Sequence, residues 1–500
     1  MKKNTSPSKP NIAIQSWLRP ALTPVPANVD FQRFKATLED VSNVLTSSSL
    51  EMHAVELALE DFPSEEAAAR NRRARFAIES LRIEIVRHLL GLVSFRQAAR
   101  MICSSDLLAE FCGLRAIDGI RGAAKSTIER RSKILTEEQL RQLLGRLTEV
   151  CGNAELAGTI GLDEAVPMDV CLVDSTCLDA NIHYPVDWVL LRDVSVTLIK
   201  AMTLVRGAGV KVRMPEEPKD FAGRMNRLCM EMTHSRHKQG SKKKRKAIFR
   251  EMKRLLRTIG DHALRHKQKL EKQFDRTRFS KVQATRICER IQGKLDQIDT
   301  VIHQAHERII GGRNLANKDK LLSVHESEVR VIKRGKAGRD VEFGNTLFIS
   351  ENQQGYITDW KLYRDTCPGE NKQLAESLER RKELDLNEPV RAVCTDRGFA
   401  GKATSALLEK MNVFDASCPR EVKVLRERMK EREFRELQKR RGGTEARIAI
   451  LTNRWLGGKV RAKGHEHRAL AVGWGVLAHN LWFIARKLAD LRKRRPAAAA

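Results

Sequence analysis

Aromatic side chains are scarce in this chain: they make up 5% of its 500 residues, and only three of them are tyrosine. Proteins hold single-stranded nucleic acid largely by stacking its bases on aromatic rings, so this composition argues against an extended surface of that kind. The ten cysteines include no CxxC pair, which excludes a zinc knuckle and gives no sign of a disulfide framework. We therefore expect the cysteines to be reduced residues of the core.

Long apolar runs are also missing, since none reaches the roughly 18 residues that a membrane-spanning helix requires. The most apolar segment, ALAVGWGVLAHNLWFIA, is interrupted by His479 and Asn480 and is predicted to be a buried helix. The first residues, MKKNTSPSKPNIAIQSW, contain lysines but not the apolar core of a signal peptide. These absences predict a cytoplasmic protein with no membrane partner.

Acidic residues are outnumbered by basic ones, with 63 Asp and Glu against 92 Lys and Arg. The formal net charge of +29 and the pI near 10.0 are typical of a protein that binds a polyanion. Because residues that stack on bases are few, double-stranded DNA is the predicted partner, which would place the protein at the nucleoid.

The length and a hydrophobic fraction of 41% suit a chain of several domains, each with its own core. Changes in composition and pattern divide the chain into five parts. They are an extended proline-containing arm (1–29), a helical DNA-binding domain (30–152), an α/β domain in two pieces (166–214 and 314–485), a basic helical hairpin inserted between these pieces (215–313), and a basic tail (486–500).

Helical periodicity dominates the predicted DNA-binding domain. The segment TEEQLRQLLGRLTEV begins with Thr136 and Gln139 at capping-box spacing and repeats leucine on one face. Shorter helices precede it, and the last of them, KSTIERRSKIL, contains Arg130 and Arg131. This succession predicts either a helix-turn-helix that reads DNA or a plain helical bundle.

The pattern changes to β-strand after Val166, where VPMDVCLVDST is an apolar, β-branched run that ends in Asp174. Two alternating runs flank the turn ENQQG, and the short strand VRAVCT stops just before Asp396. A mixed sheet with helices between its strands is predicted. The inserted hairpin has apolar residues three or four apart, and its basic first half is either a solvated face or a DNA contact.

Three acidic residues occupy positions suited to holding a metal ion. Asp174 and Asp396 end predicted strands, and Glu445 lies in KRRGGTEARIAILTNRW, where a Gly-Gly break precedes a helical pattern. Carboxylates in such positions can bind Mg²⁺ or Mn²⁺. Two such ions about 4 Å apart would activate the attacking oxygen and stabilise the leaving oxygen at a phosphodiester. A nucleotide-binding P-loop is not expected near Lys402, because Asp396 and Ala403 replace its glycine and its Ser or Thr.

Four ordered blocks make the chain resemble a DDE transposase of a bacterial insertion sequence. They are VDSTCLDANIHYPVDWVLLRD around Asp174, VEFGNTLFISENQQGYITDWKLY, TDRGFAGKATSALLEKMNV around Asp396, and RRGGTEARIAILTNR with VGWGVLAHNL around and after Glu445. The resemblance implies an α/β catalytic domain of ribonuclease H-like fold, with a mixed sheet and flanking helices. It also implies cleavage of element ends and joining of the 3′ hydroxyl to target DNA, with two Mg²⁺ ions that Mn²⁺ can replace.

Carried over by position, the three carboxylates would be the metal ligands, with Asp174 and Asp396 on adjacent strands. Asn181 and His183 match the same block and would either orient the site or be structural turn residues. Arg441, four residues before the glutamate, would share its helical face and either hold a DNA phosphate or be an ordinary surface charge.

Two features depart from the pattern of such transposases. The spacing from Asp174 to Asp396 is 396 − 174 = 222 residues, against 445 − 396 = 49 from there to Glu445, so the large insertion precedes the second aspartate. Related enzymes often have a Lys or Arg seven residues after the glutamate, where this chain has Thr452, followed by Arg454. Arg454 is the candidate for this DNA contact, and without compensation the enzyme would be weakened.

Other functions share parts of this pattern. HEHR, at residues 465–468, matches the His-x-x-Arg of tyrosine recombinases, but the last tyrosine, Tyr363, lies well upstream, so their nucleophile is missing. His465 and His467 are expected to be solvated loop residues. The remaining alternatives are a catalytically inactive or domesticated DNA-binding descendant and a nuclease on the same fold. A transposase must unite two terminal inverted repeats and then target DNA, so we expect a dimer or higher oligomer on DNA.

Overall fold

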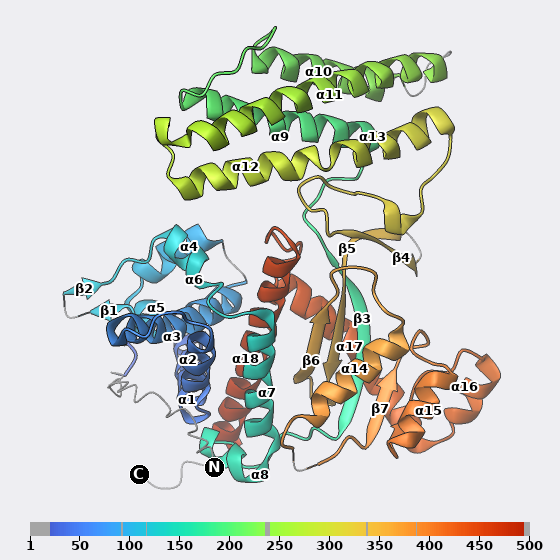
Figure 1. Ribbon diagram of the computed structural model, residues 1–500. Helices are drawn as coiled ribbons and strands as arrows, with labels where there is room; N and C mark the ends of the chain where they lie inside the picture. The colour runs from blue at the N-terminus through green and yellow to red at the C-terminus, as the bar shows by residue number, and fades with distance from the viewer. Residues whose placement is uncertain are drawn as a thin grey trace, which may run out of the picture. The chain divides into compact units, whose positions relative to one another are not determined.

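The computed structural model describes residues 21–91, 94–116, 118–235, 241–336, 339–386 and 388–494. They form a mixed α/β structure, in which a sheet of parallel and antiparallel strands is accompanied by helices (Figure 1). The chain divides into two compact units. The first contains Met1–Leu178, Thr346–Tyr363 and Cys367–Ala500, and the second contains Asp179–Asn345 and Arg364–Thr366.

The N-terminal part of the first unit is helical. Its elements are α1 (Val29–Ser47), α2 (Leu50–Glu60), α3 (Ala67–Leu89), α4 (Phe95–Cys103), α5 (Asp106–Phe111), the short antiparallel strands β1 (Arg115–Ala116) and β2 (Gly119–Ile120), α6 (Lys125–Arg131), α7 (Glu137–Gly152), α8 (Ala154–Ala157) and a 3₁₀ turn (Gly158–Ile160). Thr136 and Gln139 form the predicted capping box at the start of α7. This confirms the helix start read from the sequence.

The C-terminal helix α18 (His465–Arg494) packs against α1, α3 and α7 in this unit. Its central residues are buried, among them Trp474 and Leu481, which share one apolar core with the N-terminal helices. The predicted buried helix is thereby confirmed, and no described helix is long and apolar enough to cross a membrane. The predicted DNA-binding helices and α18 therefore belong to one compact unit.

The sheet has the strand order β4, β5, β3, β7, β8, with β6 also paired to β5. The strands are β3 (Val170–Asp179), β4 (Arg330–Lys336), β5 (Arg339–Glu351), β6 (Ile357–Leu362), β7 (Ala392–Thr395) and β8 (Phe414–Asp415). β7 runs parallel to both β3 and β8, whereas β4 and β6 are antiparallel to β5. The turn between β5 and β6 lies where ENQQG predicts it.

Two details of the sheet-containing domain differ from the sequence prediction. Asp174 is the fifth residue of β3 and does not end it, because the strand continues beside β5 after β7 has stopped. The helix α17 (Arg432–Ile450) passes through Gly442 and Gly443 without a break. Phe434 and Leu437 before these glycines and Ile448 after them are buried, and their packing offsets the cost of about 1 kcal/mol per helical glycine. The other elements of this domain are α14 (Glu370–Lys382), α15 (Lys402–Lys410), α16 (Val422–Arg428) and a π-helical turn (Leu451–Trp455).

The second unit is a helical bundle with its own apolar core (Figure 1). It contains α9 (Asp187–Gly207), α10 (Pro218–His234), α11 (Ser241–Gln273), α12 (Lys281–Leu295) and α13 (Ile298–His306), with 3₁₀ turns at Phe274–Arg276 and Asn317–Asp319 and a π-helical turn at Glu307–Gly311. The unit begins at Asp179 rather than at residue 215, because α9 buries Leu191 and Leu198 against the bundle. The predicted two-helix hairpin is thus part of a larger helical unit.

Asn480 joins α18 to β6 and provides a test of this packing. Its side chain is fully buried; Oδ1 accepts a hydrogen bond from the Ile357 N–H (3.0 Å), and Nδ2 donates one to the Ile357 carbonyl (2.7 Å). Replacement by alanine leaves both backbone groups unpaired in the core. We expect Asn480→Ala to lower the free energy of unfolding by about 2–4 kcal/mol in urea denaturation. Asn453→Ala, at an exposed position, should change it by less than about 0.5 kcal/mol, and equal reductions would contradict this role.

Candidate active site

The parallel pairing of β3 with β7 places two aspartates side by side. The register runs from Val170 opposite Ala392 to Val173 opposite Thr395, and the next residue on each chain segment is an aspartate, Asp174 and Asp396. Neighbouring strands lie about 4.8 Å apart, so the two carboxylates emerge at the same edge. The structure therefore brings together two of the three acidic residues at the carboxyl end of β7.

The Asp174 carboxylate is 8% exposed and accepts a hydrogen bond from the Ser175 N–H at 2.7 Å. Its pKa is raised to about 6, first by burial and then by the charge of Asp396. Glu445 raises this pKa further, and Arg441 acts in the opposite direction. All three acidic residues of the resemblance are thus close enough to interact electrostatically.

Helix α17 supplies both Glu445 and Arg441, which lie four residues apart and so share a face. Glu445 is exposed. The Arg441 Nε donates to the Gln438 side chain at 3.3 Å, and Gln438 Nε2 donates to the carbonyls of Thr395 (3.3 Å) and Ala416 (2.6 Å). These bonds tie α17 to the ends of β7 and β8.

A buried carboxylate at the end of β5 fixes α17 on either side of Glu445. The Glu351 side chain is 1% exposed; its Oε1 accepts a hydrogen bond from Thr444 Oγ1 (2.8 Å), and its Oε2 pairs with Arg447 Nε (2.5 Å). Gly355, at φ +93°, leaves room for the Arg447 guanidinium, which any side chain at that position would meet. The end of β5 and the turn after it therefore position the helix of the third carboxylate, a role for which the sequence contains no signal.

Glu370 is a fourth carboxylate at this edge, and it was not predicted. It is the first residue of α14, and its side chain packs on Gly398, where a Cβ atom would collide with it. Burial raises the pKa of Glu370, and Asp396 and then Asp174 raise it further, while Arg420 opposes them. An acidic residue in the first turn of a helix after Pro-Gly is common, so the pattern alone could not mark it.

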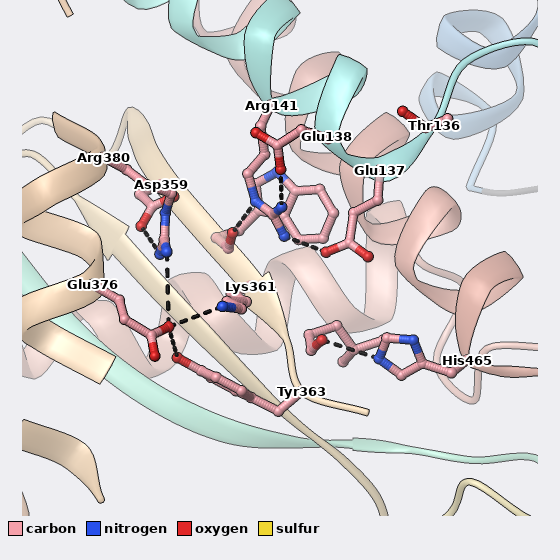
Figure 2. A network of polar contacts seen from close by, with 12 residues as sticks. Thr136, Glu137, Glu138, Arg141, Asp359, Lys361, Tyr363, Glu376, Arg380 and His465 are labelled. Carbon is pink, nitrogen blue, oxygen red and sulfur yellow. Dashed lines mark hydrogen bonds and ion pairs between the residues drawn. The ribbon is translucent and has the colours of Figure 1, made fainter. Parts of the chain in front are cut away.

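Helix α14 is held against β6 by a network of polar contacts (Figure 2). Arg380 forms a two-pronged ion pair with Asp359 (2.7 and 3.2 Å), and Glu376 accepts from Lys361 (2.9 Å) and from the Tyr363 hydroxyl (3.2 Å). This network fixes the helix that begins with Glu370.

Figure 2 also corrects the prediction for one histidine of the HEHR segment. The ring of His465 is buried at the start of α18, and its Nε2 lies 3.0 Å from the Leu362 carbonyl oxygen. His467 is half-buried and also lies in the helix rather than in a loop, with its Nδ1 2.6 Å from the Lys463 carbonyl oxygen. His465 is buried because α18 begins earlier than the apolar pattern of the sequence indicates.

None of the four carboxylates is paired with a cation in the described part of the chain. Asp174, Asp396, Glu370 and Glu445 form no ion pair there with any Lys or Arg, although the chain contains 92 of them. Oxygen-only donors suit Mg²⁺ or Mn²⁺, so the chemistry of the set fits these ions. Among the described residues, no three His, Cys, Asp or Glu side chains are drawn together closely enough to hold a metal ion.

The remaining predicted site residues belong to other elements of the chain. Asn181 and His183 belong to the second unit, where His183 Nε2 lies 3.1 Å from an Asp193 carboxylate oxygen. Arg130 at the end of α6 is exposed. Arg131, its neighbour, forms an ion pair with the buried Glu79, so its charge already has a partner.

Thr452 and Arg454 both lie in the π-helical turn that follows α17. The Thr452 hydroxyl donates to the Ile448 carbonyl at 2.9 Å and is thus used within the helix. The exposed Arg454 guanidinium lies over the Trp482 ring, 5.0 Å from its centroid, and over that of Trp455 at 5.4 Å. Its charge remains available to an anion.

Comparisons of the chain with models of known protein families, with characterised proteins and with solved structures find no match.

The burial of Asp174 predicts a stability difference that depends on pH. Its pKa of about 6 lies above the ordinary value of 3.8, so ionisation of Asp174 disfavours the folded state. This free-energy penalty grows as the pH rises from about 4 to 6 and is constant at higher pH. In a chelating buffer, Asp174→Asn should stabilise the protein by about 2–3 kcal/mol near pH 8 and leave it unchanged near pH 4. Thermal unfolding across this range measures the difference. A constant difference at every pH would contradict the assignment.

The Glu351 network predicts that α17 loosens when the buried charge is removed. Glu351→Gln keeps an acceptor for Thr444 but leaves Arg447 without its ionic partner. Because Arg447 is partly exposed, we expect the free energy of unfolding to fall by about 1–3 kcal/mol, less than for a fully buried pair. Amide hydrogen exchange should rise around residues 444–447, and unchanged exchange there would argue against this role. The matched control is Glu436→Gln, which removes only a surface pair with Arg432 on the same helix.

Proposed function

We propose that this chain is a metal-dependent DNA transposase whose catalytic domain has a ribonuclease H-like fold. The observation that supports it best is the parallel register that sets Asp174 beside Asp396, with Glu445 close enough to raise the pKa of Asp174. The protein would bind the terminal inverted repeats of its element, cut at their ends and transfer them to target DNA. Two ends must be held together, so it would act as a dimer or higher oligomer, at the nucleoid.

Asp174, Asp396 and Glu445 would hold the metal ions, Mg²⁺ or Mn²⁺, with Glu370 as a further oxygen donor. When bound, such ions activate the attacking oxygen and stabilise the leaving oxygen of a phosphodiester. The chain's own groups fix the geometry around them: the sheet aligns the two aspartates, and Glu351 holds the helix of the glutamate. Arg441 is placed to meet a phosphate near the carboxylates, and Arg454 offers a second cationic group on the turn after α17.

A DNA-binding descendant that no longer cuts is the second candidate. One observation favours it: the described carboxylates are not gathered into a set of three that could hold a metal ion. Glu445 is exposed, so a turn of its side chain toward the aspartates would still complete the site of the first candidate. A nuclease that hydrolyses without joining uses the same metal chemistry and differs in the product.

Cleavage of DNA that contains the element's own ends separates these candidates. With Mg²⁺ or Mn²⁺, the native protein should nick the ends, and Asp396→Asn should reduce the rate by at least about a thousandfold while DNA binding persists. Asp415→Asn is the matched control, because Asp415 lies on the adjacent parallel strand but outside the carboxylate cluster. Tight binding without any cutting by the native protein would overturn the enzyme assignment. Nicked products without joined ones would indicate a nuclease.

A further inference from the structure

The second unit contains a pocket of about 650 Å³. It lies between the segment that leads into α9, the start of α11 and the π-helical turn Glu307–Gly311. Its volume falls within the roughly 300–1,000 Å³ of ordinary ligand sites. The walls contain four basic side chains, from Lys242, Arg245, Lys246 and Arg308, and one acidic side chain, from Asp187.

The acidic side chain is already neutralised by its neighbours. Asp187 is 4% exposed; its Oδ1 accepts from Gln304 Nε2 (2.8 Å), and its Oδ2 pairs with Arg308 (3.4 Å). Lys242 and Lys246, one turn apart on α11, form no ion pair with any described residue. The pocket therefore has an excess of positive charge and suits an anion such as a phosphate.

An exposed aromatic ring stands at the same pocket. The chain has only three tyrosines, and Tyr356 and Tyr363 are buried, whereas Tyr184 is 74% exposed. Its ring makes an edge contact with Phe343 (centroids 5.5 Å apart), and Pro185 restricts the backbone that follows it. A fixed, exposed ring of this kind offers a flat face on which a nucleic-acid base can stack.

A second ring strengthens the pocket wall. The Trp188 Nε1 donates to Thr233 Oγ1 at 3.0 Å, and the Arg245 guanidinium lies 5.0 Å from the centroid of the Trp188 ring. Arg245 is thus held in place rather than free to swing into solvent. One of the four cationic side chains is therefore positioned before a ligand arrives, which lowers the entropic cost of binding.

We infer that this pocket binds one unpaired nucleotide of a DNA strand, with its phosphate on Lys242, Lys246 and Arg308 and its base stacked on Tyr184. The inference rests on the proposed function, which supplies DNA as the partner. An acidic peptide would satisfy the lysines, but a nucleotide uses the flat ring as well. The surrounding charge agrees: residues 215–313 contain 26 Lys and Arg and 12 Asp and Glu, a net charge of 26 − 12 = +14. The insertion would then contact DNA directly rather than being only a solvated face.

Binding of a short fluorescent oligothymidylate to the full chain tests the stacking half of the inference. Tyr184→Ala should weaken binding at least about fivefold, whereas Tyr184→Phe keeps the ring and should bind like the native protein. An oligonucleotide with abasic sites in place of its bases provides the second arm. The native protein should bind the abasic strand as weakly as Tyr184→Ala binds the intact strand. On the abasic strand, Tyr184→Ala and the native protein should have equal affinity. An equal weakening by Tyr184→Ala on intact and abasic strands would overturn base stacking.

The salt dependence of the same binding tests the phosphate half. Lys242→Ala combined with Lys246→Ala should lower the slope of log affinity against log salt by about 0.7 for each phosphate that is no longer neutralised. Arg250→Ala combined with Arg254→Ala is the matched control, since it removes the same charge at the same spacing from exposed positions on α11. An equal change of slope in the control pair would show a general charge effect and overturn the site.

Other outcomes separate this inference from the proposed function. If the native protein binds and cuts its element ends while all the pocket variants bind the oligonucleotide normally, only the pocket assignment fails. If the pocket variants bind duplex DNA more weakly but bind the single-stranded oligonucleotide normally, the assignment to an unpaired nucleotide is wrong. If the native protein binds no DNA at low salt, the inference and the proposed function fail together.

Discussion

The parallel pairing between β3 and β7 is the constraint on which the candidate site depends. It ends at Val173 and Thr395, so the following residues, Asp174 and Asp396, are held side by side by backbone hydrogen bonds rather than by their own interactions. Two carboxylates in this position repel each other, and burial adds to the cost for Asp174. The fold tolerates a locally unfavourable arrangement, which proteins do mainly at functional sites.

The rest of the sheet-containing domain supports this edge with rigid elements. Glu351 contacts Thr444 and Arg447 of α17, on either side of Glu445. Gln438 of the same helix donates hydrogen bonds at the ends of β7 and β8. The ion pairs between α14 and β6 do the same for the helix that begins with Glu370. The elements from which these carboxylates project are thus anchored at further points, and such support is how functional groups are kept in place.

The sequence predicted the structural features that depend on interactions between residues close together along the chain. The capping box of α7, the long helix α11, the turn after β5 and the strand that stops before Asp396 depend on neighbours along the chain, and all are found. What could not be predicted depends on distant partners. β3 continues past Asp174 because β5 remains beside it. α17 continues through its two glycines because buried residues hold both halves of the helix. Glu370 lies at the carboxylate edge only because of tertiary packing. The predicted domain boundary at residue 215 also left α9 in the sheet domain, although its apolar residues are buried in the helical bundle.

The charge distribution is the strongest support for the proposal that cations complete the site. A DNA phosphate is negative, and so are the four carboxylates at this edge, so the substrate would be repelled if it approached them alone. Lysines and arginines could have neutralised these groups in a chain of net charge +29, yet no described Lys or Arg forms an ion pair with them. A permanent ion pair would fill the space in which a phosphate and its counter-ions must meet. In the proposed transposase, Arg454 and the pocket lysines of α11 would hold the DNA backbone, and the unpaired carboxylates would be left to divalent ions.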